Sequence, residues 1–265
     1  MTATPDAPGL PPESPAAPLT TDAVLGGRLR LTQLAKGHRV GHDAILLAAA
    51  APASARHLAD LGAGVGSAGL AALLRLPGAD ALLVELDPGL AALARDNAQS
   101  NGLAPRCRVL ADDVCALARP GGPVPEAAGA FDLILSNPPF NAVHAHQTSP
   151  DARKARAHMA QDGTLRDWIT AAYRCLAPGG LLAMILRPED LAPLLSGLEG
   201  RFGAADLLPV HPRPHRPAVR LIVRAVKGRR TAPVVLPSFI LADAEGRASA
   251  EAEAVLRDLA PLPGR

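Results

Sequence analysis

From Arg56 onward, short apolar segments alternate with longer segments that have the apolar spacing of helices. This alternation is typical of βαβ units, and runs that are apolar at successive positions indicate strands of a parallel sheet covered on both faces. Right-handed crossovers then give a doubly wound, Rossmann-like α/β sheet with helices on both faces. We expect strands at 56–62, 79–87, 106–112, 131–137, 181–187, 205–211 and 218–226, and helices at 67–76, 88–102, 165–180 and 188–203. The last two strands are close in sequence, so they are expected to form an antiparallel hairpin at one edge.

The 265 residues divide into four predicted segments. Residues 1–21 are rich in Pro and Ala and are expected to be a disordered tail. Residues 22–52 are expected to form a short hairpin and then a helix, residues 53–230 the main domain, and residues 231–265 a C-terminal extension of that domain. Aromatic residues are only 2% of the chain, so the core is expected to consist of Ala, Leu and Val. We find neither a secretory signal nor an apolar run of the ~18 residues that span a bilayer, and expect a cytoplasmic protein.

A glycine-rich turn, "DLGAGVG", follows the first predicted strand. Gly62, Gly64 and Gly66 have the spacing of a nucleotide-binding turn, in which side chains would block the approach of a ligand to the backbone. A dinucleotide site and a glycine turn without a ligand are the alternatives. Asp60, directly before the turn, is better suited to a ligand with a cationic amine than to a pyrophosphate.

Three acidic residues are expected at the same edge of the sheet. Glu85, at the end of the second strand, lies about where an acid binds both hydroxyls of a ribose. Asp112 and Asp113 follow the third strand. One of them could accept from an adenine amine while the other caps the next helix, and we favour Asp113 for the adenine. Asp87 is expected to cap the helix that begins at Pro88.

These motifs, followed by "NPPF" after the fourth strand, resemble those of class I S-adenosylmethionine-dependent methyltransferases that methylate a planar amine. The resemblance implies a seven-stranded sheet, the last strand antiparallel, with S-adenosylmethionine bound over the carboxyl ends of the first four strands. It implies cofactor contacts from Asp60, Gly62, Gly64, Gly66, Glu85, Asp112, Asp113 and Asn137.

The "NPPF" corner suits the chemistry of a planar amine, whose delocalised lone pair makes it a poor nucleophile. The side-chain oxygen of Asn137 and the carbonyl of Pro138 can accept both amine hydrogens and so aim the lone pair at a methyl donor. Positioning and electrostatics then supply most of the rate. The two prolines, Pro138 and Pro139, fix the direction of the carbonyl, and Phe140 can stack on a flipped-out base. A rigid strand terminator with a core Phe is the purely structural alternative.

Within this class, the sequence more specifically resembles the bacterial tRNA(Val) adenine-N6 methyltransferases. This resemblance covers roughly residues 22–258. It includes "RVGHDAILLAAA", "LAPGGLLAMIL" and the segment from "RPAVRLIVRAVKG" to "AEGRASAEAEAVLRD". It implies methyl transfer to the N6 amine of an adenine in RNA, with tRNA as the expected partner. In that family the upstream segment, here Arg39, Gly41 and Asp43, walls the cofactor pocket. The alternative for Asp43 is a helix N-cap.

Two departures and three alternatives stand beside this resemblance. The segment after the last strand lacks an aromatic residue and a Thr common in the family, and the loop after "NPPF" is long. The alternatives are a glutamine-N5 protein methyltransferase, a guanine-N2 rRNA methyltransferase, and a non-catalytic module that binds S-adenosylmethionine or RNA. The first usually carries a larger N-terminal domain, and the second usually has a histidine after "NPPF", where Asn141 stands here.

Basic residues suggest where RNA would bind. The net charge is only +2, so a nucleic-acid surface must come from local clusters. Residues 201–230 hold eight Lys or Arg and one acid, Asp206. We therefore expect phosphate contacts. The histidines of the loop after "NPPF" lack metal-ligand spacing, so no metal is expected. Separately, we expect the protein to be a monomer. The candidate RNA contacts are Arg153, Lys154, Arg156, Arg213, Arg216 and Arg220.

Overall fold

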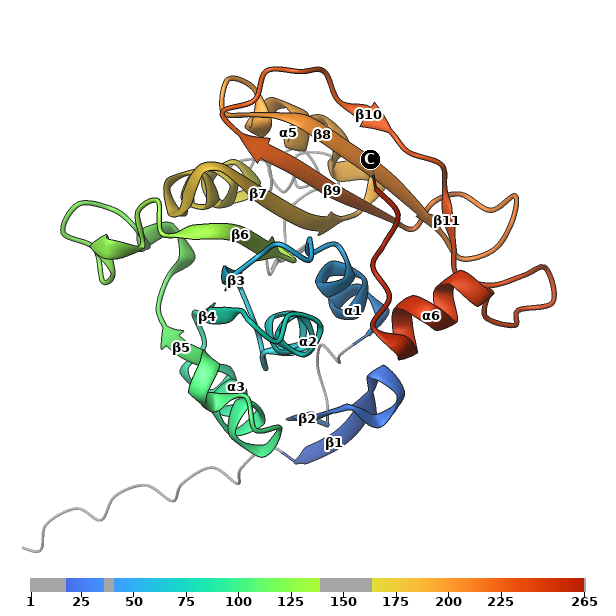
Figure 1. Ribbon diagram of the computed structural model, residues 1–265, viewed down its shortest axis with the longest axis horizontal. Helices are drawn as coiled ribbons and strands as arrows, with labels where there is room; N and C mark the ends of the chain where they lie inside the picture. Colours follow the sequence, from blue (N-terminus) through green and yellow to red (C-terminus); the bar gives the residue numbers. More distant parts are fainter. Residues whose placement is uncertain (1–17, 36–40, 139–163, 265) are drawn as a thin grey trace, which may run out of the picture.

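A twisted sheet forms the centre of the molecule (Figure 1). The computed structural model describes residues 18–35, 41–138 and 164–264. In this part of the chain the large sheet has nine strands, in the order β10-β8-β9-β7-β6-β3-β4-β5, with β11 also paired to β8. The strands are β3 (His57–Leu61), β4 (Asp80–Glu85), β5 (Cys107–Ala111), β6 (Phe131–Ser136), β7 (Leu176–Leu186), β8 (Phe202–His211), β9 (Arg220–Lys227), β10 (Val234–Val235) and β11 (Phe239–Ile240).

The strand directions confirm the predicted doubly wound sheet. β3 pairs in parallel with β4 and β6, β4 with β5, and β6 with β7, whereas β9 is antiparallel to both β7 and β8. The seven predicted strands are all present, and the last of them is the antiparallel one. The predicted edge position of the final hairpin is wrong, because β10 and β11 extend the sheet beyond β8.

Helices cover both faces of the sheet, and each face has its own hydrophobic cluster. Leu133 and Leu135 of β6 belong to one cluster and Ile134 between them to the other, which is the two-residue period of a strand buried on both faces. α1, α2, α3 and α6 contribute to the first cluster, and α5 and the helix at 164–175 to the second. Their bounds are α1 (His42–Ala49), α2 (Ser67–Arg75), α3 (Pro88–Ser100), α5 (Leu191–Leu198) and α6 (Ala250–Asp258).

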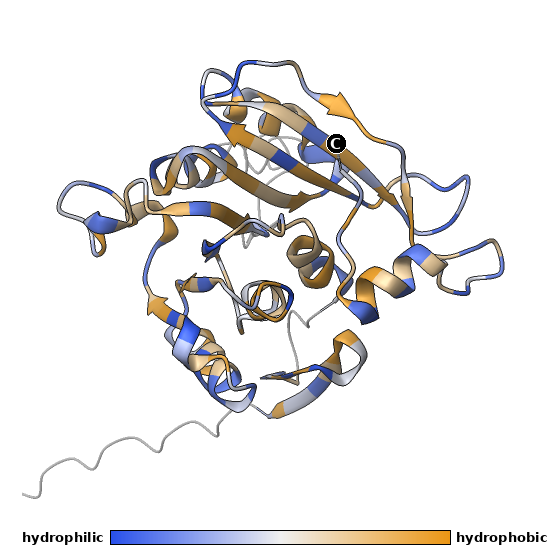
Figure 2. Ribbon diagram, in the orientation of Figure 1, coloured by the Kyte–Doolittle hydropathy of each residue, from blue (hydrophilic) through white to orange (hydrophobic). Residues whose placement is uncertain are grey.

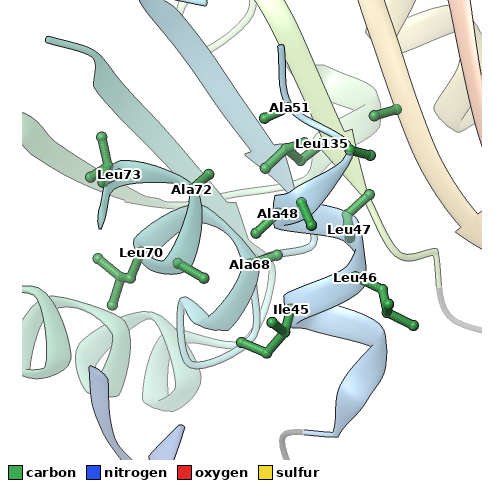
Figure 3. Close-up of a cluster of buried hydrophobic side chains, with 14 of the residues drawn as sticks. Ile45, Leu46, Leu47, Ala48, Ala51, Ala68, Leu70, Ala72, Leu73 and Leu135 are labelled. Atoms are coloured by element: carbon green, nitrogen blue, oxygen red, sulfur yellow. The ribbon is translucent and has the colours of Figure 1, made fainter. Parts of the chain in front are cut away.

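Small side chains line the contact between α1 and α2. Figure 3 shows Ala48 and Ala68 between the two helices, with Leu47 beside Leu135 of the sheet. An alanine-rich surface lets helices approach closely, so this core is compact despite its few aromatic residues. The close fit holds the N-terminal ends of both helices beside the carboxyl ends of the strands.

The N-terminal hairpin consists of β1 (Leu19–Val24) and β2 (Leu29–Leu34). It begins earlier than predicted, since Leu19–Thr21 were assigned to the tail. The side chains of Asn97 and Asn101 fix β2 on α3. Each amide accepts from and donates to the backbone of one β2 residue, Thr32 for Asn97 and Arg30 for Asn101, at 2.7–2.9 Å.

Three further boundaries differ from the sequence prediction. The helix predicted over 188–203 ends at Leu198, and β8 begins at Phe202. The helix at 164–175 ends before "LAPGG", and β7 already begins at Leu176. Between the pairs Phe131–Leu176 and Leu133–Leu181 the register shifts, so the Pro-Gly-Gly segment forms a bulge within the strand instead of a helix terminator. After β5, the helix that Asp112 or Asp113 was expected to cap is only a 3₁₀ turn, Val114–Ala116.

Candidate active site

A pocket of about 560 Å³ lies at the carboxyl ends of β3 and β6. Parallel sheets of this kind bind ligands at that edge, where the strand order reverses. Its lining includes six of the predicted cofactor residues, namely Gly41, Asp43, Asp60, Gly62, Gly64 and Asn137. It also includes Arg220, which was predicted to contact RNA.

The three glycines of the turn at 62–66, hereafter the glycine loop, all have positive φ: +75° at Gly62, +57° at Gly64 and +90° at Gly66. A Cβ at Gly62 would lie 2.5 Å from the ring of Trp168, and one at Gly66 would lie 3.0 Å from Leu83. Only at Gly64 would a Cβ meet open space. Packing against protein therefore excludes a side chain at Gly62 and Gly66, whereas Gly64 faces open space at the pocket.

Asp60 is buried below the glycine loop, with 2% of its surface exposed. Its Oδ2 accepts a hydrogen bond of 2.8 Å from the backbone N–H of Gly69 in α2. Burial raises the pKa of this carboxyl to about 7, the bond from Gly69 opposes the rise, and the charge of Glu85 adds to it. A cationic group in the pocket would favour the ionised form.

Glu85 connects the glycine loop to the end of β4. Its Oε2 accepts from the N–H of Gly64 at 2.8 Å, and its Oε1 accepts from the N–H of Asp87 at 2.9 Å. As predicted, Asp87 caps α3, accepting from Gly89 and Leu90. Glu85 thus fixes the backbone of Gly64 in the wall of the pocket.

Asp112 and Asp113 are distinguished by their hydrogen bonds. Asp113 is the N-cap of the 3₁₀ turn after β5 and accepts from the N–H of Cys115 at 2.8 Å. Asp112 accepts from the N–H of Asp113 at 2.7 Å, and its own N–H bonds to the carbonyl of Glu85. The capping role thus falls to Asp113, the residue that we had favoured for the adenine.

The amide of Asn137 follows β6 and lines the pocket. Its Oδ1 is buried and has no hydrogen-bond partner among the described residues. A buried acceptor without a partner costs free energy, and this one belongs to a residue of the pocket wall, where a donor on a ligand would complete its bonding. Pro138, which follows, is buried; Pro139 and Phe140 lie outside the described residues.

An ion pair closes another wall of the pocket. Nε of Arg220, at the start of β9, donates to Oδ2 of Asp43 in the first turn of α1 at 2.7 Å. The N-cap position of α1 is Gly41, so the alternative reading of Asp43 as an N-cap is wrong. Arg220 thus contributes to the wall of the pocket, and 31% of its side chain is exposed. Arg39 lies outside the described residues.

Asn97 and Trp168 contribute to the site without having been predicted. Asn97 is 1% exposed, and besides holding Thr32 its Nδ2 donates to the carbonyl of Val65 in the glycine loop at 3.0 Å. Two asparagines four residues apart in one helix, Asn97 and Asn101, were the available signal, because Asn is a poor helix former. For Trp168 the only signal was that it is the single Trp.

The basic residues at 201–230, hereafter the late basic cluster, do not form one surface. Arg213 and Arg216 are exposed in the loop between β8 and β9, on the pocket side of the sheet. Arg229 and Arg230 follow β9 and therefore lie at the opposite edge. Arg224, between them in the sequence, is half-buried and pairs with Asp206 at 3.7 Å. Arg153, Lys154 and Arg156 lie outside the described residues.

Among the described residues, no group of three or more His, Cys, Asp or Glu side chains is placed to hold a metal ion. No helix in the same residues has both the length and the apolar character needed to cross a membrane.

Comparison with curated proteins finds several methyltransferases. The chain is 31% identical over 212 residues to a protein of Porphyromonas gingivalis named tRNA1(Val) (adenine(37)-N6)-methyltransferase, covering 77% of this chain and 80% of that one. It is 33% identical over 183 residues to a release factor glutamine methyltransferase of Bradyrhizobium diazoefficiens, covering 66% of this chain and 57% of that one.

Among solved structures, the fold resembles that of a predicted O-methyltransferase from Agrobacterium tumefaciens, with a TM-score of 0.70 and 29% identity. The likeness covers 83% of this chain and 98% of that one. Residues 41–209 match the family model described as the methyltransferase small domain, and they span the glycine loop, Asn137 and most of the sheet. The chain belongs to the methyltransferase small domain family.

Proposed function

We propose that this protein transfers a methyl group from S-adenosylmethionine to the exocyclic N6 amine of an adenine in tRNA. The observation that carries the proposal is the buried, unpartnered Oδ1 of Asn137 in the wall of the pocket. An amine hydrogen is the partner that this acceptor lacks. The named activity of the Porphyromonas gingivalis relative supports adenine in tRNA as the source of that amine.

S-adenosylmethionine is the methyl donor, and residues in the pocket and at the ends of β4 and β5 fit its parts. Asp60 is a buried carboxyl whose charged form a cationic amine would favour. Glu85 lies at the end of β4, where an acid can accept from ribose hydroxyls. Asp112, relieved of capping by Asp113, is our choice for the adenine amine of the cofactor. Gly64 leaves space at the pocket wall where any side chain would intrude.

The chain's own task in the reaction is to orient the substrate nitrogen. S-adenosylmethionine supplies an electrophilic methyl group on a sulfonium. Asn137 Oδ1 and the carbonyl of Pro138 accept the two amine hydrogens, which turns the nitrogen lone pair toward that methyl. Both acceptors follow a strand buried on both faces, so their directions are set before the substrate arrives. Preorganised acceptors of this kind lower the barrier without a strong base.

Pro139 and Phe140 complete the proposed substrate site. Pro139 restricts the peptide that carries the Pro138 carbonyl. The ring of Phe140 stacks on the extruded base, as aromatic side chains do in enzymes that modify a base outside its stack. This part of the proposal rests on the sequence alone.

The direct test is to incubate the protein with total tRNA and S-adenosylmethionine carrying a labelled methyl group. The RNA is then digested to nucleosides and analysed by mass spectrometry. The proposal predicts label in N6-methyladenosine. Label only in methylated guanosine would overturn the choice of adenine, and saturable cofactor binding without transfer to any RNA or protein would indicate a non-catalytic module.

The second candidate acceptor is a glutamine side chain in a protein. It is favoured by the likeness to the release factor glutamine methyltransferase, and its amide nitrogen is also planar. The same assay with a purified release factor in place of tRNA distinguishes the two. Label in the protein and none in the RNA would select glutamine.

A further inference from the structure

The loop at residues 212–219 connects β8 to β9 beside the pocket. Val210 before it and Val219 at its end both line the pocket, and the N–H of Val219 bonds to the carbonyl of Val210 at 2.8 Å. The loop therefore begins and ends at the pocket wall. It lies near the turn before α6 on the same side of the molecule (Figure 1).

This loop is held in one shape. Pro212, Pro214 and Pro217 restrict its backbone. His211 fixes it from the end of β8, because Nδ1 donates to the carbonyl of Arg216 at 2.5 Å. In the tautomer that this bond requires, Nε2 accepts from the hydroxyl of Ser238 at 3.1 Å. A stiff loop holds its side chains at fixed positions relative to the pocket.

The loop presents two arginines to solvent. Arg213 and Arg216 are exposed, and in the described part of the chain no carboxylate forms an ion pair with either. In the nearest acidic turn the ion pairs of Asp243 and Glu245 are made with Arg247, at 2.8 Å and 3.4 Å, and not with the arginines of the loop. Figure 2 shows both segments as predominantly hydrophilic.

We propose that loop 212–219 is a preformed RNA clamp, in which Arg213 and Arg216 bind backbone phosphates next to the nucleotide whose base enters the pocket. Guanidinium groups bind phosphate oxygens bidentately, and such contacts fix register without reading sequence. The inference rests on the proposed function and adds to it the surface that orients the RNA. It also separates these two arginines from Arg224, Arg229 and Arg230, which lie in β9 or shortly after it.

The test compares two double variants that remove the same charge. Arg213→Ala/Arg216→Ala alters the clamp, and Arg229→Ala/Arg230→Ala alters exposed arginines at the opposite edge of the sheet. For each, the dissociation constant for tRNA is measured across salt concentrations by fluorescence anisotropy, and the constant for S-adenosylmethionine by calorimetry. The clamp variant is expected to reduce the log–log salt slope by about two, one for each lost phosphate contact, and to leave cofactor affinity unchanged.

The control variant is expected to behave like the wild type. Equal slopes and affinities for both double variants would overturn the clamp. Arg213→Lys/Arg216→Lys is expected to keep the slope, since the charge remains, and loss of slope there would also contradict phosphate binding. A wild-type protein that neither binds nor methylates tRNA would instead overturn the proposed function.

Discussion

The side chain of Asn97 joins the glycine loop to the N-terminal hairpin. Its Nδ2 donates both to the carbonyl of Val65 in the glycine loop, at 3.0 Å, and to the carbonyl of Thr32 in β2, at 2.9 Å. Its Oδ1 accepts from the N–H of Thr32 at 2.8 Å. One buried amide therefore couples a segment before the core domain to the wall of the pocket.

Asn97→Ala is expected to weaken S-adenosylmethionine binding several-fold. The substitution leaves backbone groups of Thr32 and Val65 without these partners, at about 1–3 kcal/mol for each buried group. Asn101→Ala is the matched control, because Asn101 holds β2 through Arg30 and makes no bond to the glycine loop. Calorimetric titration of both variants checks the difference. Equal cofactor affinities would show that the bond to Val65 has no role in the pocket.

Gly64→Ala and Gly66→Ala are expected to fail in different ways. Both positions have positive φ, which costs an L-residue about 1–2 kcal/mol. At Gly64 the new methyl enters open space at the pocket, so binding of S-adenosylmethionine is lost with only a small fall in Tm. At Gly66 the methyl lies 3.0 Å from Leu83 and 3.1 Å from Leu70, so the Tm falls further. Thermal unfolding with and without the cofactor separates the two, and a Gly64→Ala protein with wild-type affinity would contradict the assignment.

Asp60 is expected to make both the stability of the fold and the affinity for S-adenosylmethionine depend on pH. Burial raises the pKa of its carboxyl to about 7, so the folded protein binds this proton more tightly than the unfolded chain does. Its contribution to stability is therefore largest below the ordinary value of 3.8 and falls as pH rises toward about 7. Affinity for S-adenosylmethionine should rise over the same interval, because a cationic amine favours the ionised carboxylate.

Asp60→Asn is expected to flatten both profiles. The ligand's amine stays protonated below about 7.7, so its own titration does not interfere in this range. Cofactor affinity and urea unfolding measured from acidic to neutral pH provide the check. Parallel profiles for the wild type and the variant would rule out Asp60 as the titrating group.

Asp112→Ala and Asp113→Ala should separate cofactor binding from stability. Asp113 is the N-cap of the turn after β5, so its loss costs about 1 kcal/mol of stability and leaves cofactor affinity unchanged. Asp112→Ala is expected to lower cofactor affinity with little change in Tm. Urea unfolding and calorimetry of the pair provide the test, and the opposite assignment of effects would restore Asp113 as the contact to the adenine.

Local patterns predicted the parts of the fold that depend on neighbouring residues. The apolar runs identified all seven long strands, and the sequence Asp87-Pro88 identified the start of α3. β1 was placed too late because "LTTDAV" is half-exposed and pairs only with β2. β10 and β11 were missed because each has two residues and depends on pairing with β8.

In the pocket, too, local motifs were predictable from the sequence, whereas contacts between distant residues were not. Gly64 and Asn137 belong to compact motifs, so the sequence identified them. Asp43 and Arg220 are 177 residues apart in the chain, and Asn97 and Val65 are 32 apart. Only the folded sheet brings such pairs together. The glycine loop also combines two environments in one motif, open space at the pocket at Gly64 and core packing at Gly62 and Gly66.

The measurement that tests the central claim most directly compares Asn137→Ala with the wild type for cofactor binding and for methyl transfer to tRNA. Asn137→Asp, which keeps an acceptor at the same place, is the matched variant and should retain part of the activity. The account predicts that Asn137→Ala binds S-adenosylmethionine with nearly wild-type affinity and loses about 10²–10³-fold in turnover, the scale of removing one preorganised polar contact to the reacting group. Unchanged turnover in Asn137→Ala would contradict the account.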